Sequence, residues 1–392
     1  MIPFAGRTRH LRSSAIRDLL ALTQRPGIIS LAGGLPAPDS FPADRIAAVS
    51  ARLLGAGTVD SLQYSTTEGH PGLREWIADR ASHERNRPVA PEHIVITHGS
   101  QQALDLIAKL LIDPGTEVAI DEPGYIGAIQ ALSMFEPVFL PIPVDHDGLR
   151  VEVLAERLAA GARPRLLYTV VNFQNPTGAT LTAERRARLA QLADDYAFLI
   201  IEDDPYGVLR FAGEPVPSIA HWTDRVVTLG TFSKLVVPGF RVGWMVAPDW
   251  LAPMAIRAKQ SADLHTNSFG QAVLAELVTE RSWLADHTES LVRIYGSRMR
   301  ALADGLETEV GDRLTCNRPE GGMFLWARTT DGTVADTLLP AALDRGVAFV
   351  PGVAFSCGEG DPFALRLSYS VASPEVLLEG ARRLALAFSD VA

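Results

Sequence analysis

A single lysine is the best candidate for chemistry in this chain. Of the 36 basic residues three are lysines, namely Lys109, Lys234 and Lys259. Lys234 follows an apolar stretch and closes the cluster Gly230-Thr231-Phe232-Ser233-Lys234, with Arg241 seven positions later. A lysine held in such a pocket with a lowered pKa is the residue type that forms Schiff bases. Lys109 and Lys259 fall on predicted helices away from strand ends, so Lys234 is the candidate nucleophile.

Three further polar clusters follow predicted strands: His98-Gly99-Ser100-Gln101-Gln102, Asn172-Phe173-Gln174-Asn175-Pro176-Thr177-Gly178 and Glu202-Asp203-Asp204-Pro205-Tyr206. Ligands of open α/β sheets bind beyond the carboxyl ends of the strands, so these clusters are expected to meet. The first cluster is either a phosphate site at a helix start, using Ser100 and Gln101, or a turn with an N-cap serine. Taken one at a time, the second cluster is typical of a turn and the third of a solvated acidic loop.

The elements that position these clusters alternate between short β-rich runs and helical patterns. Candidate strands span residues 94–97, 117–120, 138–140, 165–171, 198–202, 226–229 and 242–246. One helix is predicted after Ser100, and another runs from about Thr182 to Tyr196 with an N-cap near Thr182. This alternation predicts an α/β domain with a mostly parallel seven-stranded sheet flanked by helices.

The pattern changes after about residue 285. A long helix is predicted there, followed by strands near residues 321–327 and 365–370. We therefore predict an N-terminal arm over residues 1–41 that belongs in part to a small domain, a large domain over 42–285, and a small C-terminal α/β domain over 286–392.

Composition excludes several classes of protein. The net charge is −10 and the pI about 5.4, which argues against nucleic-acid binding. Cys316 and Cys357 cannot form a disulfide framework, and a reduced cytoplasmic setting fits them. The nine histidines show no metal-ligand spacing, so no metal site is expected. No membrane segment, secretory signal, dinucleotide fingerprint or P-loop is recognised in the sequence.

In chain order, the motifs combine into one pattern: Gly99-Ser-Gln-Gln, Asn175-Pro-Thr-Gly, Asp203-x-x-Tyr206, Thr231-x-Ser-Lys234, Arg241-Val-Gly and Arg366-Leu-Ser. This pattern resembles the fold-type I, pyridoxal-phosphate-dependent aminotransferases of class I/II, and the resemblance extends from Arg17 to Arg366. Ser14-Ala-Ile-Arg17, the segment 30–36 and the segment 62–69 resemble the 2-aminoadipate and kynurenine aminotransferase subgroup. The resemblance implies an aspartate-aminotransferase-like fold in which residues 42–285 bind pyridoxal 5'-phosphate.

The resemblance also implies roles around the cofactor ring. Lys234 would form the Schiff base and move the proton, and Asp203 would pair with the ring nitrogen. Asn175 and Tyr206 would bind the phenolic oxygen, and Tyr125 would stack on the ring. The alternative for Tyr125 is an ordinary core tyrosine.

The same comparison assigns the phosphate and substrate contacts. Ser100, Gln101, Thr231, Ser233 and Arg241 would hold the phosphate, with Thr231 where many relatives carry serine. Tyr64 would reach it from the neighbouring subunit of a homodimer. The substrate contacts implied are Arg366 on the α-carboxylate with help from Asn175, the lining residues Gly34 and Leu35, and the N-terminal segment with Ser14 and Arg17. Arg17 would meet an acidic side chain, or else it is a solvated helix charge.

Three functions are compatible with these residues. The first is transamination between an L-α-amino acid and a 2-oxo acid, with 2-oxoglutarate and glutamate as the expected second pair. The second is another reaction of the same cofactor, namely decarboxylation, oxidation or carbon–carbon bond formation. The third, a sensor similar to the aminotransferase-like halves of transcription regulators, would need a DNA-binding domain that the arm 1–41 is too short to supply.

Overall fold

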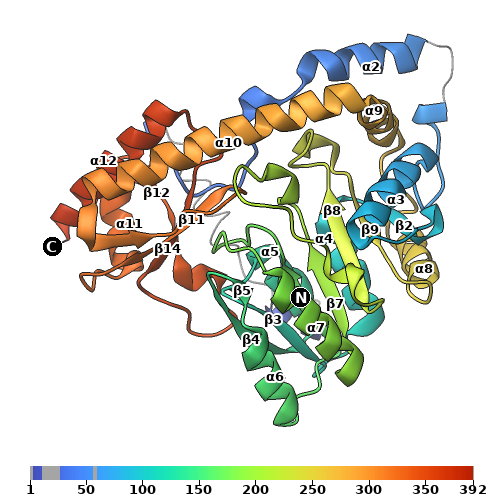
Figure 1. The fold of residues 1–392 in the computed structure, drawn as a ribbon, viewed down its shortest axis with the longest axis horizontal. Coiled ribbons are helices and arrows are strands. Elements are labelled where there is room, and N and C mark those ends of the chain that lie inside the picture. Colours follow the sequence, from blue (N-terminus) through green and yellow to red (C-terminus); the bar gives the residue numbers. More distant parts are fainter. Residues whose placement is uncertain (1–2, 11–26, 56–59, 392) are drawn as a thin grey trace.

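An eight-stranded sheet forms the centre of the fold, as seen in a computed structural model of the chain (Figure 1). The structure describes residues 3–10, 27–55 and 60–391, so Ser14 and Arg17 lie outside the described residues. The strand order is β2-β9-β8-β7-β6-β3-β4-β5. The strands are β2 Ile94–Thr97, β3 Glu117–Glu122, β4 Val138–Asp145, β5 Gly148–Leu149, β6 Leu166–Val170, β7 Leu199–Asp203, β8 Val226–Thr231 and β9 Gly243–Val246.

The sheet confirms the predicted strands and adds one. Strands β8, β7, β6, β3 and β4 run parallel, whereas β9 and β2 on one edge and β5 on the other are antiparallel to their neighbours. All seven predicted strands are present. The sheet has an eighth strand, β5, so the predicted number of seven is wrong. This two-residue strand turns back against the end of β4 and is too short to produce a hydrophobic period in the sequence.

Helices cover both faces of the sheet. In β6, Leu166, Tyr168 and Val170 face the core that contains α4 (Gly99–Leu111), whereas Leu167 faces α6 (Val151–Ala159) and α7 (Ala183–Tyr196). Every residue of β6 and β7 is buried, as parallel strands covered on both sides require. The remaining helices of this part are α3 Pro71–Arg85, α5 Ile126–Ser133, α8 Ala252–Ala262 and α9 Ser268–Thr279.

Helix α7 begins as the sequence predicts. The Thr182 side chain accepts a hydrogen bond from the backbone N–H of Arg185 and so caps the helix. The alternative explanation of Ser100, an N-cap serine, is wrong, because α4 begins at Gly99 after His98 and no side chain caps it. The first backbone N–H groups of α4 are thus left without a side-chain partner.

A second, antiparallel sheet is formed by the C-terminal third. Its strands, in the order β10-β11-β14-β13, span Leu314–Cys316, Phe324–Thr329, Ala364–Ser368 and Val350–Pro351. The helices α10 (Arg281–Glu309), α11 (Ala335–Asp344) and α12 (Pro374–Asp390) pack around it. In Figure 1, α10 runs from this part along the top of the molecule towards α2 (Ala43–Gly55) and α9.

The N-terminal segment pairs with the C-terminal third. Strand β1 (Ile29–Ser30) runs parallel to β12 (Val347–Ala348). This pairing supports our proposed division of the chain into a large domain and a small domain that draws on both ends. The proposed boundary near residue 285 falls close to the start of α10. Within the described residues, none of the helices has the length and apolar character needed to cross a membrane.

Candidate active site

One cavity of about 610 Å³ collects the residues that the sequence singled out. It lies beyond the carboxyl ends of β2, β3, β6, β7 and β8, and Phe324 of β11 and Arg366 of β14 line its other side. The predicted site residues that line it are Gly34, Leu35, Ser100, Gln101, Tyr125, Asn175, Asp203, Tyr206, Thr231, Ser233, Lys234, Arg241 and Arg366. Segments from Gly34 to Arg366 thus meet at one place.

Asp203 is the last residue of β7 and is buried at the floor of this cavity. The Tyr168 hydroxyl donates to its Oδ2 at 2.8 Å, whereas its Oδ1 has no partner. Burial raises the pKa of Asp203 to about 7, and the Asp204 charge adds to the rise, whereas the hydroxyl groups of Tyr168 and of nearby Ser100 oppose it. A carboxylate with one anchored and one free oxygen is suited to bind a cationic group of a ligand.

Lys234 lies in the turn that follows β8. Its Nζ donates to the backbone carbonyl of Gly34 at 2.9 Å, and no carboxylate is paired with it among the described residues. Burial, together with the positive charges of Arg241 and Arg366, lowers the pKa of Lys234 to about 8. A substantial fraction of neutral amine is therefore available near neutral pH, as a nucleophile or base needs.

Arg366 on β14 is buried between two aromatic rings. Its guanidinium carbon lies 4.2 Å from the ring centre of Phe324 and 4.7 Å from that of Phe355. Nη1 donates to Asn175 Oδ1 at 2.8 Å and Nη2 to the Ala32 carbonyl at 2.6 Å, whereas Nε has no partner. Burial lowers the pKa of Arg366 to about 10. The group is a rigid, poorly solvated cation suited to a carboxylate.

Hydroxyl groups and Arg241 define another end of the cavity. Ser233 is linked to Thr231 by a 3.0 Å hydroxyl contact, and Arg241 Nη1 lies 3.5 Å from Ser233 Oγ. Ser100 Oγ is buried without a partner, whereas the Gln101 side chain donates to the Gly127 carbonyl. With the free N–H groups at the start of α4, these residues form a site for an anion.

Three side chains are placed around the middle of the cavity. Tyr206 lies beside Asn175, and burial raises its pKa, an effect that the Asn175 hydrogen bond opposes. Tyr125 precedes the first residue of α5, and burial raises its pKa as well. The Tyr125 ring lines the cavity, in agreement with a ligand-facing tyrosine.

Tyr64 does not line this cavity. Its side chain is 79% exposed and its ring meets His265 edge-on at 5.7 Å. The structure of one chain therefore leaves Tyr64 on the surface, apart from the other predicted site residues. Leu35 lines the cavity but is also 57% exposed, at its rim.

The sequence reasoning missed Tyr168, Phe324 and Phe355. Tyr168 carried a usable signal, since a tyrosine inside an otherwise aliphatic buried strand needs a partner for its hydroxyl group. The two phenylalanines come from β11 and from the turn after β13, and no spacing in the sequence links either of them to Arg366.

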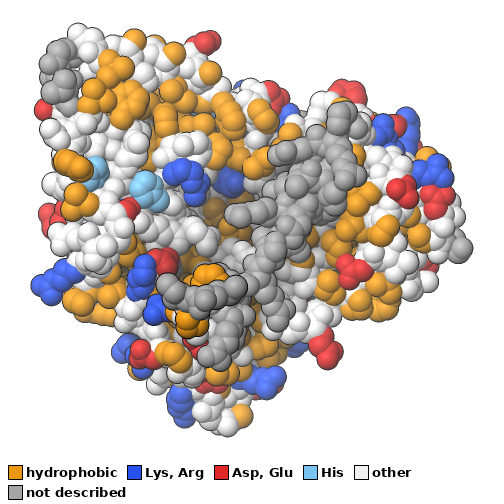
Figure 2. Space-filling view, turned by 180° about the vertical axis from the view of Figure 1, so that it is seen from behind, with side chains coloured by type: hydrophobic (Ala, Val, Ile, Leu, Met, Phe, Trp, Pro, Cys, Tyr) orange, Lys and Arg blue, Asp and Glu red, His pale blue; other side chains and the backbone are white. Residues whose placement is uncertain are grey.

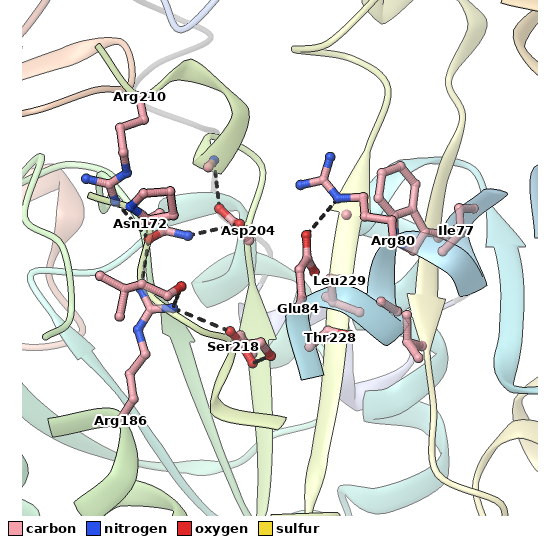
Figure 3. A pocket seen from close by; sticks show the side chains of 18 residues that line it. Ile77, Arg80, Glu84, Asn172, Arg186, Asp204, Arg210, Ser218, Thr228 and Leu229 are labelled. Atoms are coloured by element: carbon pink, nitrogen blue, oxygen red, sulfur yellow. Dashed lines mark hydrogen bonds and ion pairs between the residues drawn. The ribbon is translucent and has the colours of Figure 1, made fainter. Parts of the chain in front are cut away.

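A second, smaller cavity of about 180 Å³ lies on the other side of the segment 203–207. Figure 3 shows Asn172 between Arg186 and Asp204. Arg186 donates to Asn172 Oδ1 at 2.8 Å, and Asn172 Nδ2 donates to Asp204 Oδ2 at 3.0 Å. Asp204 Oδ1 accepts from the backbone N–H of Gly207. The polar side chains here are paired with one another, so they brace the loop that carries Asp203.

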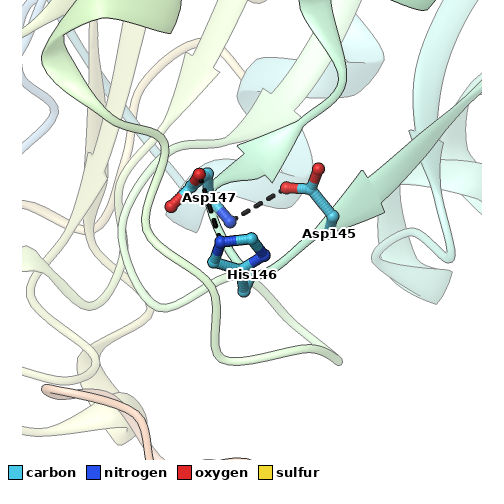
Figure 4. Close-up of side chains that lie close together, drawn as sticks. All are labelled: Asp145, His146 and Asp147. Carbon is cyan, nitrogen blue, oxygen red and sulfur yellow. Dashed lines mark hydrogen bonds and ion pairs between the residues drawn. The ribbon is translucent and has the colours of Figure 1, made fainter.

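A cluster of Asp145, His146 and Asp147 at the end of β4 resembles a cation site (Figure 4). Arg185 supplies a cation already, because Nη1 and Nη2 donate to the two oxygens of Asp145 at 2.5 and 2.8 Å. This ion pair lowers the pKa of Asp145. The cluster is accounted for without a metal ion.

The donor set of the large cavity fits pyridoxal 5'-phosphate. Three buried polar atoms that lack partners line it, Ser100 Oγ, Asp203 Oδ1 and Arg366 Nε. Buried polar groups are normally paired, so three orphans in one cavity indicate that a ligand completes them. An anion site, a carboxylate and a lysine amine match a phosphate, a ring nitrogen and an aldehyde, respectively.

Comparison with known proteins supports the same conclusion. The family "Aminotransferase class I and II" matches residues 29–384. Aromatic-amino-acid aminotransferase 1 of Thermococcus litoralis is 40% identical over 389 residues, 97% of this chain and 93% of that protein. The solved kynurenine aminotransferase of Pyrococcus horikoshii superposes with a TM-score of 0.94 at 38% identity, covering 99% of this chain and 97% of that one.

The α-aminoadipate aminotransferase of Thermus thermophilus, solved with N-(5'-phosphopyridoxyl)-L-leucine, has a TM-score of 0.92 at 38% identity, covering 99% and 97% of the two chains. This chain thus has the aspartate-aminotransferase-like fold and belongs to the class I and II aminotransferases. It is an enzyme that catalyses transamination with pyridoxal 5'-phosphate.

Proposed function

We propose that this enzyme transfers the amino group of an L-α-amino acid to a 2-oxo acid, with glutamate and 2-oxoglutarate as one pair. The observation that carries the proposal is the convergence of Lys234, Asp203 and Arg366 on one cavity with unpaired buried atoms. Arg366 binds the α-carboxylate through its guanidinium, whose planar fork matches that group, and Asn175 holds the guanidinium in place.

Five side chains position the cofactor ring in this proposal. Bound pyridoxal 5'-phosphate supplies an electron-withdrawing ring beside the substrate α-carbon. Asp203 holds the ring nitrogen in its protonated form, and that positive charge in turn keeps Asp203 ionised. Tyr168 fixes the orientation of the carboxylate. Asn175 and Tyr206 would hold the phenolic oxygen, and Tyr125 would lie against the ring.

Lys234 holds and moves the proton. Its lowered pKa leaves part of the amine neutral, so Nζ could take up the proton of the substrate α-carbon and act as the base that holds and moves it. The Gly34 carbonyl accepts a hydrogen bond from the amine and orients it. The phosphate binds at the anion site formed by Ser100, Gln101, Thr231, Ser233 and Arg241.

Borohydride reduction followed by peptide mapping tests this assignment. We expect the reduced cofactor on Lys234, and we expect Lys234→Ala to lose covalent attachment and activity. Lys109→Ala is the matched control, since Lys109 is exposed on α4 and pairs with Asp105. Recovery of the label on Lys109 or Lys259 would overturn the proposal.

The walls of the cavity support a broad range of amino donors. Leu35, Ile126 and Phe324 are apolar, and among the described lining residues the cations are Lys234, Arg241 and Arg366. The two relatives from Thermococcus litoralis and Thermus thermophilus are named for aromatic and acidic substrates. A panel of amino acids with 2-oxoglutarate, followed by the absorbance change of the cofactor, identifies the donors directly.

For an acidic donor we propose that the segment with Ser14 and Arg17 completes the substrate pocket. A charge-assisted hydrogen bond from Arg17 to the distal carboxylate is worth about 1.5–3 kcal/mol. Arg17→Ala is therefore expected to lower kcat/KM about 10- to 150-fold for an acidic donor and to leave an apolar donor almost unchanged. Equal losses on both donors would make Arg17 a structural residue.

We propose that two chains form a homodimer in which Tyr64 completes the partner's phosphate site. Tyr64 is exposed and does not line the large cavity of its own chain, which supports this proposal. The exposed apolar side chains of Leu54 and Leu62, 52% and 61% exposed, support it as well. Figure 2 shows hydrophobic side chains gathered on the part of the surface that carries α2 and α9. We further propose a cytoplasmic location, in keeping with the two free thiols, Cys316 and Cys357.

Mixing two inactive variants tests the dimer. Tyr64→Ala and Lys234→Ala chains, after subunit exchange, should recover activity, because one site of each mixed dimer then has both residues. Failure to recover after verified exchange would place Tyr64 in the site of its own chain or outside both sites.

A further inference from the structure

The anion site has two sides that come from distant parts of the chain. One side is the turn from β2 into α4, residues 98–102, and the other is Arg241 before β9. His98 and Gln102 belong to the first polar cluster of the sequence, yet neither has a part in the proposed chemistry. Neither side chain lines the large cavity, so their role must be exerted through other residues.

Gln102 links the turn to helix α8. Its Oε1 accepts hydrogen bonds from the backbone N–H of His98 at 2.9 Å and from Lys259 Nζ at 3.1 Å. Its Nε2 donates to Asp263 Oδ2 at 2.7 Å. The ammonium of Lys259 and the carboxylate of Asp263 thus allow one orientation of the amide, the one that presents oxygen to His98.

Lys259 and Asp263 form a close ion pair beneath this amide. Lys259 Nζ lies 2.7 and 2.8 Å from the two oxygens of Asp263, and the lysine side chain is 0% exposed. Burial lowers the pKa of Lys259, and the Asp263 carboxylate opposes that shift. Loss of either partner would leave a charge with poor solvation beside Gln102.

The second side of the anion site touches the same network. The His98 ring approaches Asp263 Oδ2 at 3.3 Å and lies beside the backbone of Arg241. Arg241 has a left-handed backbone with φ of 55°, which is strained for a residue with a Cβ atom. A Cβ atom on Gly99 would lie 3.0 Å from Arg241 Nη2, so the two sides of the anion site approach each other closely at this point.

We propose that Lys259, Asp263, Gln102 and His98 form a partly buried positioning network that fixes the start of α4 and Arg241 relative to each other for the phosphate of the cofactor. The network acts through the backbone: Gln102 holds the N–H of His98, and His98 precedes the helix start whose N–H groups face the anion. This inference rests on the proposed function of the anion site. It assigns a role to a second lysine that forms no bond with the cofactor.

The test compares two ligands that differ by the phosphate. Dissociation constants of pyridoxal 5'-phosphate and of pyridoxal are measured with the apo-protein, for the wild type, Lys259→Met and Gln102→Leu. Lys109→Met is the control, because Lys109 and Asp105 have the same four-residue spacing but lie exposed on α4. The melting temperature of each apo-protein is recorded as well.

We expect both network variants to bind pyridoxal 5'-phosphate about 10- to 100-fold more weakly, as loss of charge-assisted hydrogen bonds predicts, and to bind pyridoxal about as the wild type does. The control should match the wild type for both ligands. Gln102→Leu keeps the ion pair of Lys259 and Asp263, so it provides a result if Lys259→Met does not fold.

Two outcomes separate the inference from the function on which it rests. Equal weakening of both ligands, or a lower melting temperature with wild-type affinities, would overturn the positioning role alone. Failure of the wild-type protein itself to prefer pyridoxal 5'-phosphate over pyridoxal would instead overturn the proposed anion site.

Discussion

The two cavities on either side of the segment 203–207 are built from the same residue types but differ in how these are paired. In the small cavity, Arg186 makes hydrogen bonds with all three of its guanidinium nitrogens, to the carbonyls of residues 171, 181, 216 and 217 and to the Asn172 side chain. In the large cavity, Arg366 keeps Nε unpaired and Asp203 keeps Oδ1 unpaired. One loop carries Asp203 towards the large cavity and Asp204 towards the small one.

This difference separates residues that bind from residues that support. Burial of an unpaired polar atom is unfavourable, so several such atoms in one cavity indicate that a ligand supplies the missing partners, whereas single unpaired atoms such as Asp121 Oδ1 also occur outside the cavity. A fully paired buried arginine contributes to the stability of the loop and has no capacity left for a ligand. Cavity walls of similar composition can therefore have opposite functions.

The largest expected contrast is between the two buried arginines. Arg186→Met removes a cation that lies 4.0 Å from the buried carboxylate of Glu202, so we expect the free energy of unfolding to fall by about 3–5 kcal/mol. Arg366→Met removes a cation that has no ion pair among the described residues, so stability should fall far less. KM for the amino acid should instead rise about 10- to 150-fold.

Urea unfolding of the apo-proteins and steady-state kinetics of the holoenzymes check this pair. The comparison between the cavities would be wrong if Arg366→Met were the less stable variant, or if Arg186→Met raised KM as much as Arg366→Met does.

The neighbouring aspartates give the next largest contrast. Asp203→Asn removes the charge that faces the ring nitrogen, and we expect kcat to fall about 10²- to 10³-fold, as for other losses of a positioned electrostatic group. Asp204→Asn keeps one oxygen that can accept from Gly207 N–H, so kcat should fall less than about tenfold. Equal losses in both variants would show that the loop, rather than the Asp203 charge, limits the rate.

The third contrast concerns pH. The pKa of Asp203 is about 7 in the fold without ligand, against 3.8 for an ordinary exposed aspartate, so the native state binds this proton more tightly. Between about pH 4 and pH 7 the free energy of unfolding of the wild type therefore decreases as pH rises, by about 1.4 kcal/mol per pH unit. This slope is measured relative to Asp203→Asn, which lacks the titrating group. With the cofactor bound, the positive ring nitrogen keeps Asp203 ionised, and this slope should disappear.

Asp121 provides the control for the pH measurement. Burial raises its pKa to about 7 as well, but it lines neither cavity and accepts from the Val170 N–H at 3.0 Å. The difference in the free energy of unfolding between wild type and Asp121→Asn should change with pH by the same slope with and without cofactor. A slope for Asp203 that persists in the holoenzyme would mean that its carboxylate does not face the ring nitrogen.

The pairing of the arginines could not have been read from the sequence. Arg186 lies in a helix whose pattern suggests a solvated charge, whereas the structure buries it almost completely. The partners of Arg366 come from residues 32, 175, 324 and 355, which no local spacing connects. Contacts of this kind depend on how the two sheets meet, which is a property of the whole chain.

The sequence by itself determined the strands, the polar clusters and the lysine. Short buried strands have a strong hydrophobic signal, and the carboxyl ends of neighbouring parallel strands must lie at one edge of a sheet, so Ser100, Asn175, Asp203 and Lys234 were expected to converge. Tertiary structure alone decided which polar atoms stay unpaired and which are held. Hydrogen bonds across the fold require donor and acceptor atoms to be placed to within a few tenths of an ångström, although their residues are far apart in sequence. Such precise placement arises only when the core has packed.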